Sequence, residues 1–373
     1  MTAQIPWWHP VLGEEEVERV AEVLRSGYPN DGAVTEEFGG RIAALCGVEH
    51  GVGVTSGTAA LMCALAACGV GEGDDVLVPD LTFVATANAV QALGARPVLV
   101  DISLEHFGMD PAAAEAALTT RTTAIVPVHV NGRGGEVDAL VELARRHRLH
   151  VVEDAAEALG SQNRGRPLGS FGHAATFSFA PSKIITTGQG GAVVTADPQI
   201  ARRVRELKDQ GRAERGTGGG ADEHPVFGLN FKLTNLQAAL GLVQLERLEE
   251  RMAYLRLLRT WYAEELDAID GGVSLVPVDE GGGEALEWID VQATDRDGLV
   301  SRLESNGIDS RPFWRPLHTL PPHAADAERF PNATRVAATG LWLPSALSLT
   351  REDVATVGRA IRAFVTAAVG ARA

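Results

Sequence analysis

Short β-rich runs alternate with helical patterns between about residues 51 and 195, and this alternation limits the fold more than any other feature of the chain. The β-rich runs are GVGVT, DVLVP, RPVLVD, TAIVPV, LHVVED, TFSFA and AVVT, and amphipathic or alanine-rich segments separate them. Strands that alternate with helices predict a mostly parallel sheet that is covered by helices on both faces. We therefore expect an α/β fold with a seven-stranded sheet, whose ligands bind at the carboxyl ends of the strands.

Regions on either side of this stretch predict a second, smaller domain. The segment GEEEVERVAEVLRSG has the pattern of an amphipathic helix that ends at a glycine C-cap. A long helical pattern runs from Asn235 to about Leu266, and the remainder combines a helix, the extended segment RPFWRPLH and a final helix. We expect a large domain over residues 26–243, a small α+β domain over residues 244–373, and an N-terminal segment, residues 1–25, that packs with the small domain.

Charge and residue usage argue against several classes of function. A net charge of −16 argues against nonspecific nucleic-acid binding and against binding to an anionic membrane surface. No apolar stretch approaches the length of a membrane span, and the segment MTAQIPWWHP lacks the features of a signal peptide, so we expect a cytoplasmic protein. Cys46, Cys63 and Cys68 are too few and too apolar in setting for a disulfide framework, and we expect Cys63 and Cys68 to be buried structural thiols. No His/Cys spacing resembles a zinc site.

Lys183 and Asp154 are the residues on which the functional interpretation depends. Lys183 follows the strand-like stretch TFSFA, and Asp154 ends the run LHVVED. A lysine at the end of a buried strand is costly to desolvate unless it is paired, depressed in pKa or covalently bound. An amine that forms a Schiff base and a carboxylate that keeps a pyridine nitrogen protonated are what pyridoxal phosphate chemistry needs. The alternative for the lysine is an ordinary surface position in a loop.

Other candidate residues also fall at predicted strand ends. Ser56, Gly57 and Thr58 begin a helix after GVGVT, where backbone amides and the helix dipole favour an anion, although Ser-Gly-Thr also makes an ordinary N-cap. Ser178 points away from its buried phenylalanine neighbours, which is compatible with a phosphate contact or with a small residue on a half-buried strand. Phe83 can stack on a flat heterocycle or pack in the core.

Six stretches of the chain, in this order, resemble one known family. They are SGTAAL, DLTFVATANAV, VVEDAAEALGS, FSFAPSKIITTGQGGAVVT, GLNFKLTNLQAALGLVQLE and RPFWRPLH, and together they extend over most of the chain. The chain resembles the nucleotide-sugar aminotransferases, a family of fold-type I pyridoxal phosphate enzymes within the aspartate aminotransferase superfamily. It is most similar to perosamine-synthase-like members, which aminate a 4-keto-6-deoxy sugar carried on a nucleotide.

The resemblance implies a role for each residue of a cofactor site. Lys183 would form the Schiff base with pyridoxal phosphate and then act as the acid and base of the proton shift. Asp154 would bind the pyridine nitrogen, and Phe83 would stack on the ring. Glu157 would lie near the ring hydroxyl, where many members have glutamine and perosamine-like members also have glutamate. The phosphate would be bound by Ser56, Gly57, Thr58 and Ser178, and by Asn230 from the partner subunit of a homodimer.

The residues of a substrate site are less clearly marked. Tyr28 and Asn30 lie in a loop that lines the substrate pocket in relatives, and the resemblance places His318 where family members contact substrate. Guanidinium groups suit pyrophosphate and carboxylate anions, although most arginines are solvated surface residues. The candidates of this kind are Arg212, Arg311 and Arg315.

The function implied by the resemblance is transfer of an amino group, most simply from L-glutamate, to a keto sugar in amino-sugar or antibiotic biosynthesis. Relatives that remove a sugar hydroxyl carry histidine at the lysine position, so Lys183 favours amination. Three alternatives remain at this point: a keto-cyclitol acceptor, a different pyridoxal reaction on the same scaffold, and a non-catalytic ligand sensor. The sensor predicts loss of the lysine, the aspartate or the phosphate turn, and all of these are present.

Overall fold

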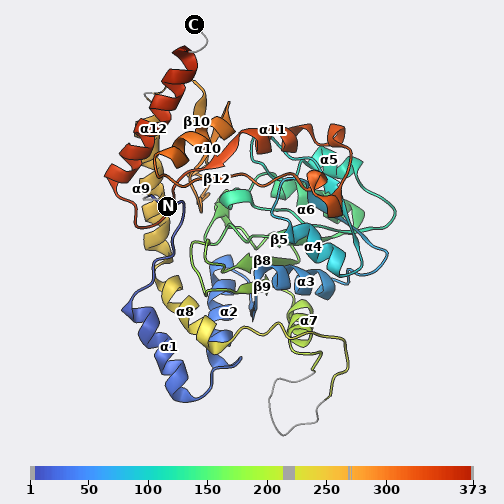
Figure 1. Ribbon diagram of the computed structural model, residues 1–373. Coiled ribbons are helices and arrows are strands. Elements are labelled where there is room, and N and C mark those ends of the chain that lie inside the picture. The colour runs from blue at the N-terminus through green and yellow to red at the C-terminus, as the bar shows by residue number, and fades with distance from the viewer. Residues whose placement is uncertain (1–4, 213–222, 268, 270, 371–373) are drawn as a thin grey trace.

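The computed structural model describes residues 5–212, 223–267, 269 and 271–370, and a seven-stranded sheet forms the centre of the fold (Figure 1). The strand order is β1-β9-β8-β5-β4-β2-β3. Only β9 runs antiparallel to its neighbours, so the sheet is mostly parallel, as the strand and helix alternation predicts. The strands are β1 (His50–Val54), β2 (Asp75–Pro79), β3 (Arg96–Val100), β4 (Thr122–Ile125), β5 (His150–Asp154), β8 (Ala174–Ser178) and β9 (Gly191–Thr195).

Helices cover both faces of this sheet because alternate strand residues are apolar on both sides. Phe177 packs in the cluster that contains Phe38, whereas Val193 packs in the cluster that contains Leu61. The first cluster includes α2 (Ala33–Cys46), and the second includes α3 (Gly57–Ala67), α4 (Ala85–Ala92) and α7 (Pro198–Lys208). Two further helices, α5 (Pro111–Ala116) and α6 (Val137–His147), and a small hairpin of β6 (Gln162–Asn163) and β7 (Arg166–Pro167) complete this region.

A second, antiparallel sheet lies in the C-terminal part of the chain, in the order β10-β11-β13-β12. Its strands are β10 (Val273–Leu275), β11 (Asp290–Ala293), β12 (Arg311–Pro312) and β13 (Gly340–Trp342). The accompanying helices are α10 (Arg296–Ser305), α11 (Pro331–Thr339) and α12 (Arg351–Gly370). This arrangement has the α+β character expected of the C-terminal region.

The long helical pattern after residue 234 forms two helices and not one. They are α8 (Asn235–Glu246) and α9 (Leu248–Asp267), which are separated at Arg247. The side chain of Thr234 caps α8 by accepting a hydrogen bond from the backbone N–H of Gln237. No glycine or proline marks the break, so periodicity alone did not predict it.

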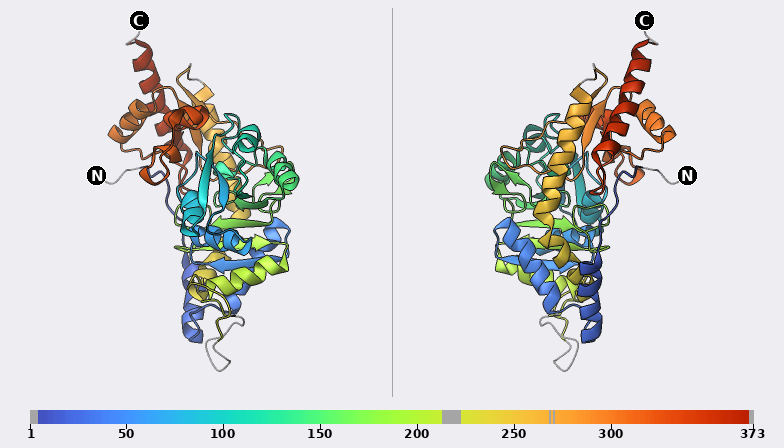
Figure 2. Two further views of the ribbon diagram at one scale, coloured as in Figure 1. Left: turned by 90° about the vertical axis from the view of Figure 1, so that its right-hand side faces the viewer. Right: turned by 90° about the vertical axis from the view of Figure 1, so that its left-hand side faces the viewer.

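The N-terminal segment contacts both ends of the molecule. Ile5 pairs with Ile308, and the backbone N–H of Ser345 donates to the carbonyl of Trp7 beside the C-terminal sheet. The chain then continues to α1 (Glu14–Ser26), which packs along α8 at the end of the molecule opposite α12 (Figures 1 and 2). The proposed boundaries at residues 25 and 243 stay predictions.

The cysteines, the apolar helices and the metal-binding side chains of the described residues bear on three expectations from the sequence. Cys63 and Cys68 are free and buried, which confirms the expectation for them, and Cys46 is free and buried as well. Burial raises the pKa of each thiol to about 12. Within the described residues, no helix combines the length and the apolar character that a membrane span requires. No cluster of three or more metal-binding side chains occurs in the same part of the chain.

Candidate active site

A cavity of about 290 Å³ opens where several strands of the large sheet end. The helix α3 begins directly after β1, and the loop after β2 leads to α4. Asp154 ends β5 and Ser178 ends β8, and these strands are parallel neighbours in the sheet. The cavity brings together nine residues predicted from the sequence: Ser56, Gly57, Thr58, Phe83, Asp154, Glu157, Ser178, Lys183 and Arg311.

One side of the cavity is the N-terminus of α3, which is suited to an anion. Ser56 is the N-cap, and its Oγ accepts a hydrogen bond from the backbone N–H of Ala59 at 3.1 Å. The backbone N–H groups of Gly57 and Thr58 belong to the first turn, where no acceptor lies within the helix. A Cβ at Gly57 would lie only 2.9 Å from the Cβ of Ser178, so glycine keeps this corner open.

Asp154 is a buried carboxylate at the base of the cavity. Its Oδ2 accepts a hydrogen bond from Thr86 Oγ1 at 2.8 Å, and its Oδ1 accepts one from the backbone N–H of Ala156 at 3.2 Å. Burial raises the pKa of Asp154, and the hydrogen bonds and the positive charge of Lys183 oppose that shift. A cation beside this carboxylate would therefore stabilise its ionised form.

Lys183 lies at the cavity with its ammonium group between two carboxylates. Its Nζ is 3.2 Å from Glu157 Oε1 and 3.3 Å from Glu287 Oε2, and its side chain is 11% exposed. The same nitrogen lies 4.8 Å from the ring centroid of Trp288, within the range of a cation–π contact. Burial alone would lower the pKa of Lys183, but the charges of Glu157 and Glu287 outweigh burial and raise it.

Glu287 and Trp288 are site residues that sequence reasoning missed. Both lie in the irregular segment between β10 and β11, and Trp288 also lines the cavity. The signal that could have found Glu287 is an acidic residue inside the apolar run ALEWI. Burial raises the pKa of Glu287 to about 7, and the adjacent Lys183 opposes that shift.

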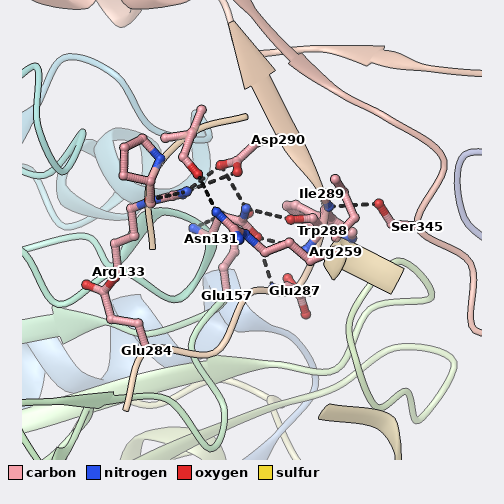
Figure 3. Close-up of polar contacts among 12 residues, drawn as sticks. Asn131, Arg133, Glu157, Arg259, Glu284, Glu287, Trp288, Ile289, Asp290 and Ser345 are labelled. Atoms are coloured by element: carbon pink, nitrogen blue, oxygen red, sulfur yellow. Dashed lines mark hydrogen bonds and ion pairs between the residues drawn. The ribbon is translucent and has the colours of Figure 1, made fainter. Parts of the chain in front are cut away.

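A network of buried polar contacts connects this segment to the large sheet (Figure 3). Asn131 Oδ1 accepts hydrogen bonds from the backbone N–H groups of Glu287 at 3.0 Å and Trp288 at 2.8 Å. Asn131 Nδ2 donates to the Trp288 carbonyl and to Asp290 Oδ2, and its own backbone N–H donates to Glu157 Oε2 at 3.0 Å. One asparagine therefore positions the two carboxylates that flank Lys183.

Phe83 and Arg311 lie at the edge of the same cavity. Phe83 is 51% exposed, which leaves its ring available to a ligand or to another chain. The Arg311 guanidinium carbon lies 5.0 Å from the ring centroid of Trp7, which fixes the direction of the side chain. Among the described residues that line the cavity, Lys183 and Arg311 carry positive charge.

Six other predicted residues are not among the residues that line this cavity, and their roles stay predictions. Tyr28, Asn30, Arg315 and Asn230 are exposed on the chain surface. His318 is buried, with its Nδ1 2.6 Å from Asp80 Oδ2 and its ring stacked on Phe330. Arg212 Nη1 lies 3.6 Å from Asp209 Oδ1, and Asp209 is not among the lining residues either.

The geometry agrees with comparisons to known proteins. A family model described as the DegT/DnrJ/EryC1/StrS aminotransferase family matches residues 10–362. The GDP-perosamine synthase of Caulobacter vibrioides is 40% identical over 352 residues, which cover 92% of this chain and 94% of the relative. The dTDP-3-amino-3,4,6-trideoxy-alpha-D-glucose transaminase of Streptomyces venezuelae is 38% identical over 349 residues, with 92% and 90% of the two chains covered.

A solved structure extends the likeness to the fold. The crystal structure of S. venezuelae DesV in complex with a ketimine intermediate matches this chain with a TM-score of 0.88 and 36% sequence identity, covering 94% of each chain. This match and the sheet topology confirm the predicted fold class. The family and its relatives likewise confirm the predicted resemblance to sugar aminotransferases.

Proposed function

The chain belongs to the DegT/DnrJ/EryC1/StrS aminotransferase family, and on that premise we propose that it transfers an amino group from L-glutamate to a nucleotide-linked 4-keto-6-deoxy sugar. The observation that carries the proposal is the position of Lys183, whose amine lies in one cavity with a buried carboxylate and a helix N-terminus. An aminotransferase needs these three elements to bind an aldehyde, a ring nitrogen and a phosphate.

We infer that the cofactor is pyridoxal 5′-phosphate, because the residues present fit each of its parts. The N-terminus of α3 and the hydroxyl of Ser178 suit a phosphate, and the cationic ring nitrogen would balance the buried charge of Asp154. Phe83 would cover the ring, and Glu157 would lie near the ring hydroxyl. When bound, this cofactor delocalises the electron pair left at the amino acid α-carbon.

The side chains of the cavity would then carry out the remaining steps. Lys183 would hold the cofactor through its amine and, once free, would move the proton of the amino acid as acid and base. Asp154 keeps the ring nitrogen charged throughout. Arg311, the second cation of the described lining, suits the carboxylate of the amino donor. Trp288 and Trp314 line the cavity beside these groups and would help to exclude water from the bound reactants.

We further propose a homodimer in which Asn230 of one subunit reaches the phosphate of the other. The support is an exposed segment before α8 that contains apolar side chains. Phe227 is 78% exposed, Val226 44% and Leu229 37%, and Asn230 lies directly beyond them. Exposed apolar residues grouped in this way are typical of an interaction surface.

The choice of acceptor rests on the relatives. The Caulobacter protein is a GDP-perosamine synthase, and the name of the Streptomyces protein gives its sugar an amino group at carbon 3. A half-reaction screen separates these possibilities. The aminated cofactor form would be mixed with 4-keto and 3-keto sugar nucleotides and with keto-cyclitols, and the products would be read by mass. Amination of a keto-cyclitol alone would overturn the proposed acceptor.

The chemistry of Lys183 is tested separately from the acceptor. The purified chain with pyridoxal phosphate should show a visible absorbance that glutamate shifts and borohydride removes, with the cofactor then attached to the Lys183 peptide. Lys183→Ala and Lys183→Arg should both abolish turnover, although arginine keeps the positive charge between Glu157 and Glu287. A Lys183→Ala variant that transaminates near the wild-type rate would reject the proposal, as would a wild-type spectrum that no amino donor changes.

A further inference from the structure

Glu287 faces the reacting amine from outside the large sheet. Its Oε2 lies 3.3 Å from Lys183 Nζ, and its Oε1 accepts a hydrogen bond from the backbone N–H of Ile184 at 2.8 Å. The residue is 4% exposed. Both carboxylate oxygens of Glu287 thus contact the segment that carries the lysine, although Glu287 itself lies 104 residues further along the chain.

The charges around Lys183 do not balance. One ammonium group faces two buried carboxylates, Glu157 and Glu287, and a buried carboxylate without a cation is costly. Burial raises the pKa of both glutamates, and repulsion from Glu157 contributes to the pKa of Glu287, which rises to about 7. The other charged groups nearby are Asp154, which acts on Glu157, and Arg251, which donates to the carbonyl of Ile184 at 2.9 Å. This cluster therefore binds a proton readily near neutral pH.

The position of Glu287 is fixed by Asn131, whose backbone has the left-handed conformation with φ 50° and ψ 41°. Non-glycine residues adopt this conformation at a cost, so the surrounding contacts must hold it. Those contacts are the hydrogen bonds from Glu287 and Trp288 to its side chain and from its backbone to Glu157 (Figure 3). Both glutamates are thus held at set distances from the lysine before any substrate binds.

We propose that Glu287 is a catalytic residue of the aminotransferase reaction, and that its carboxylate accepts the proton that the Lys183 ammonium gives up before the amine acts as a base. The N–H bond breaks, its electron pair stays on nitrogen, and an O–H bond forms on Glu287. The proton returns to the lysine later in the cycle, so none is gained or lost overall. This inference rests on the proposed role of Lys183.

The chain offers a direct test on the lysine itself, because it contains only three lysines, Lys183, Lys208 and Lys232. Trace acetylation of the cofactor-free full-length protein at a series of pH values, read by mass, gives the pKa of each. Glu287→Gln should lower the pKa of Lys183 by about one pH unit or more and leave Lys208 and Lys232 unchanged as internal references. Glutamine keeps an oxygen for the N–H of Ile184, so the fold should be retained.

The pH profile of the glutamate half-reaction distinguishes a proton acceptor from a simple ion pair. The wild-type rate should fall below about pH 7, where Glu287 becomes protonated. In Glu287→Gln the rate should no longer fall below about pH 7, and the step should be about 10²–10⁴-fold slower. Glu287→Asp should restore the fall in rate at low pH and part of the wild-type rate. In Glu157→Gln the fall in rate should begin at a lower pH, because Glu157 raises the pKa of Glu287.

Glu284→Gln is the matched control, since Glu284 is a buried glutamate of the same segment that binds the backbone N–H groups of Gly134 and Asp279. This variant should keep the wild-type rate and profile. The inference is overturned if Glu287→Gln keeps the wild-type pH profile and a rate within about twofold, even if the pKa of Lys183 falls. If borohydride still traps the cofactor on Lys183 in that variant, the proposed function stands and only the inference fails. Absence of trapping in the wild-type chain would instead reject the proposed function.

Discussion

Arg133 and Asp290 form a doubly hydrogen-bonded ion pair that is closed off from solvent. Nη1 lies 2.6 Å from Oδ2 and Nη2 lies 3.0 Å from Oδ1, and both side chains are 1% exposed. Arg133 follows the turn that carries Asn131, whereas Asp290 begins β11 of the C-terminal sheet. The pair therefore joins the two sheets directly beside the segment that carries Glu287 (Figure 3).

Removing the arginine should destabilise the whole chain. Arg133→Met leaves the Asp290 carboxylate buried without its cation, which costs about 3–5 kcal/mol in the free energy of unfolding. Urea denaturation followed by circular dichroism measures the loss. Arg145→Met is the control, because the Arg145–Glu142 pair is mostly exposed and should contribute less than about 1 kcal/mol. A loss below about 1 kcal/mol in Arg133→Met would mean that water or another group replaces the guanidinium.

The carboxylate of Asp154 should be needed for chemistry and not for folding. Asp154→Asn keeps an oxygen to accept the hydrogen bond from Thr86, and it removes the cost of a buried charge, so the cofactor-free protein should melt at or above the wild-type temperature. The half-reaction with glutamate should slow about 10²–10³-fold, since the charge that stabilises the cationic ring nitrogen is lost. Stopped-flow absorbance and thermal melts measure the two effects, and an unimpaired rate contradicts the assigned role.

Gly57 should set the space available to the phosphate. Gly57→Ala introduces a methyl group 2.9 Å from the Cβ and 3.2 Å from the Oγ of Ser178, so Ser178 must move and cofactor affinity should fall about 10-fold or more. Gly40→Ala is the matched control, because Gly40 is also helical and its added Cβ meets nothing within 4 Å. Equilibrium dialysis of pyridoxal phosphate checks both variants. Equal affinity in Gly57→Ala and the wild-type chain would show that the anion binds elsewhere.

The strand order explains which site residues could be predicted from sequence. The apolar runs that became β5 and β8 are parallel neighbours, with Asp154 paired to Thr176, so their carboxyl ends meet at one edge of the sheet. Asp154 and Ser178 follow from that rule, and Lys183 follows β8 by a short turn. The N-terminus of α3 joins the same edge because β1 runs in the same direction as β8.

Contacts across the two sheets could not be predicted in this way. Glu287 contacts Lys183 because Asn131 and Arg133 fix the position of the segment between β10 and β11. The periodic pattern of apolar residues in the sequence does not predict that position. The contact between His318 and Asp80 is of the same kind, since 238 residues separate the two along the chain. The substrate contact that the resemblance implies for His318 stays a prediction. An acidic residue inside an apolar run, as at Glu287, is the local signal that such a contact exists.

Asp75 should make the chain sensitive to acid well below neutral pH. Hydrogen bonds from Arg96 lower the pKa of this buried carboxyl to about 2, against burial that would raise it, and Thr119 adds a further hydrogen bond. Because the folded pKa lies below the unfolded value of about 3.9, this stability is present above pH 4 and is lost as the pH falls from about 4 to 2. The loss should be about 1–2 kcal/mol, since Arg96 is 58% exposed and solvent screens it. Urea denaturation at pH 5, 4 and 3 should show a shallower decline in Asp75→Asn than in the wild-type chain, and parallel declines would contradict this assignment.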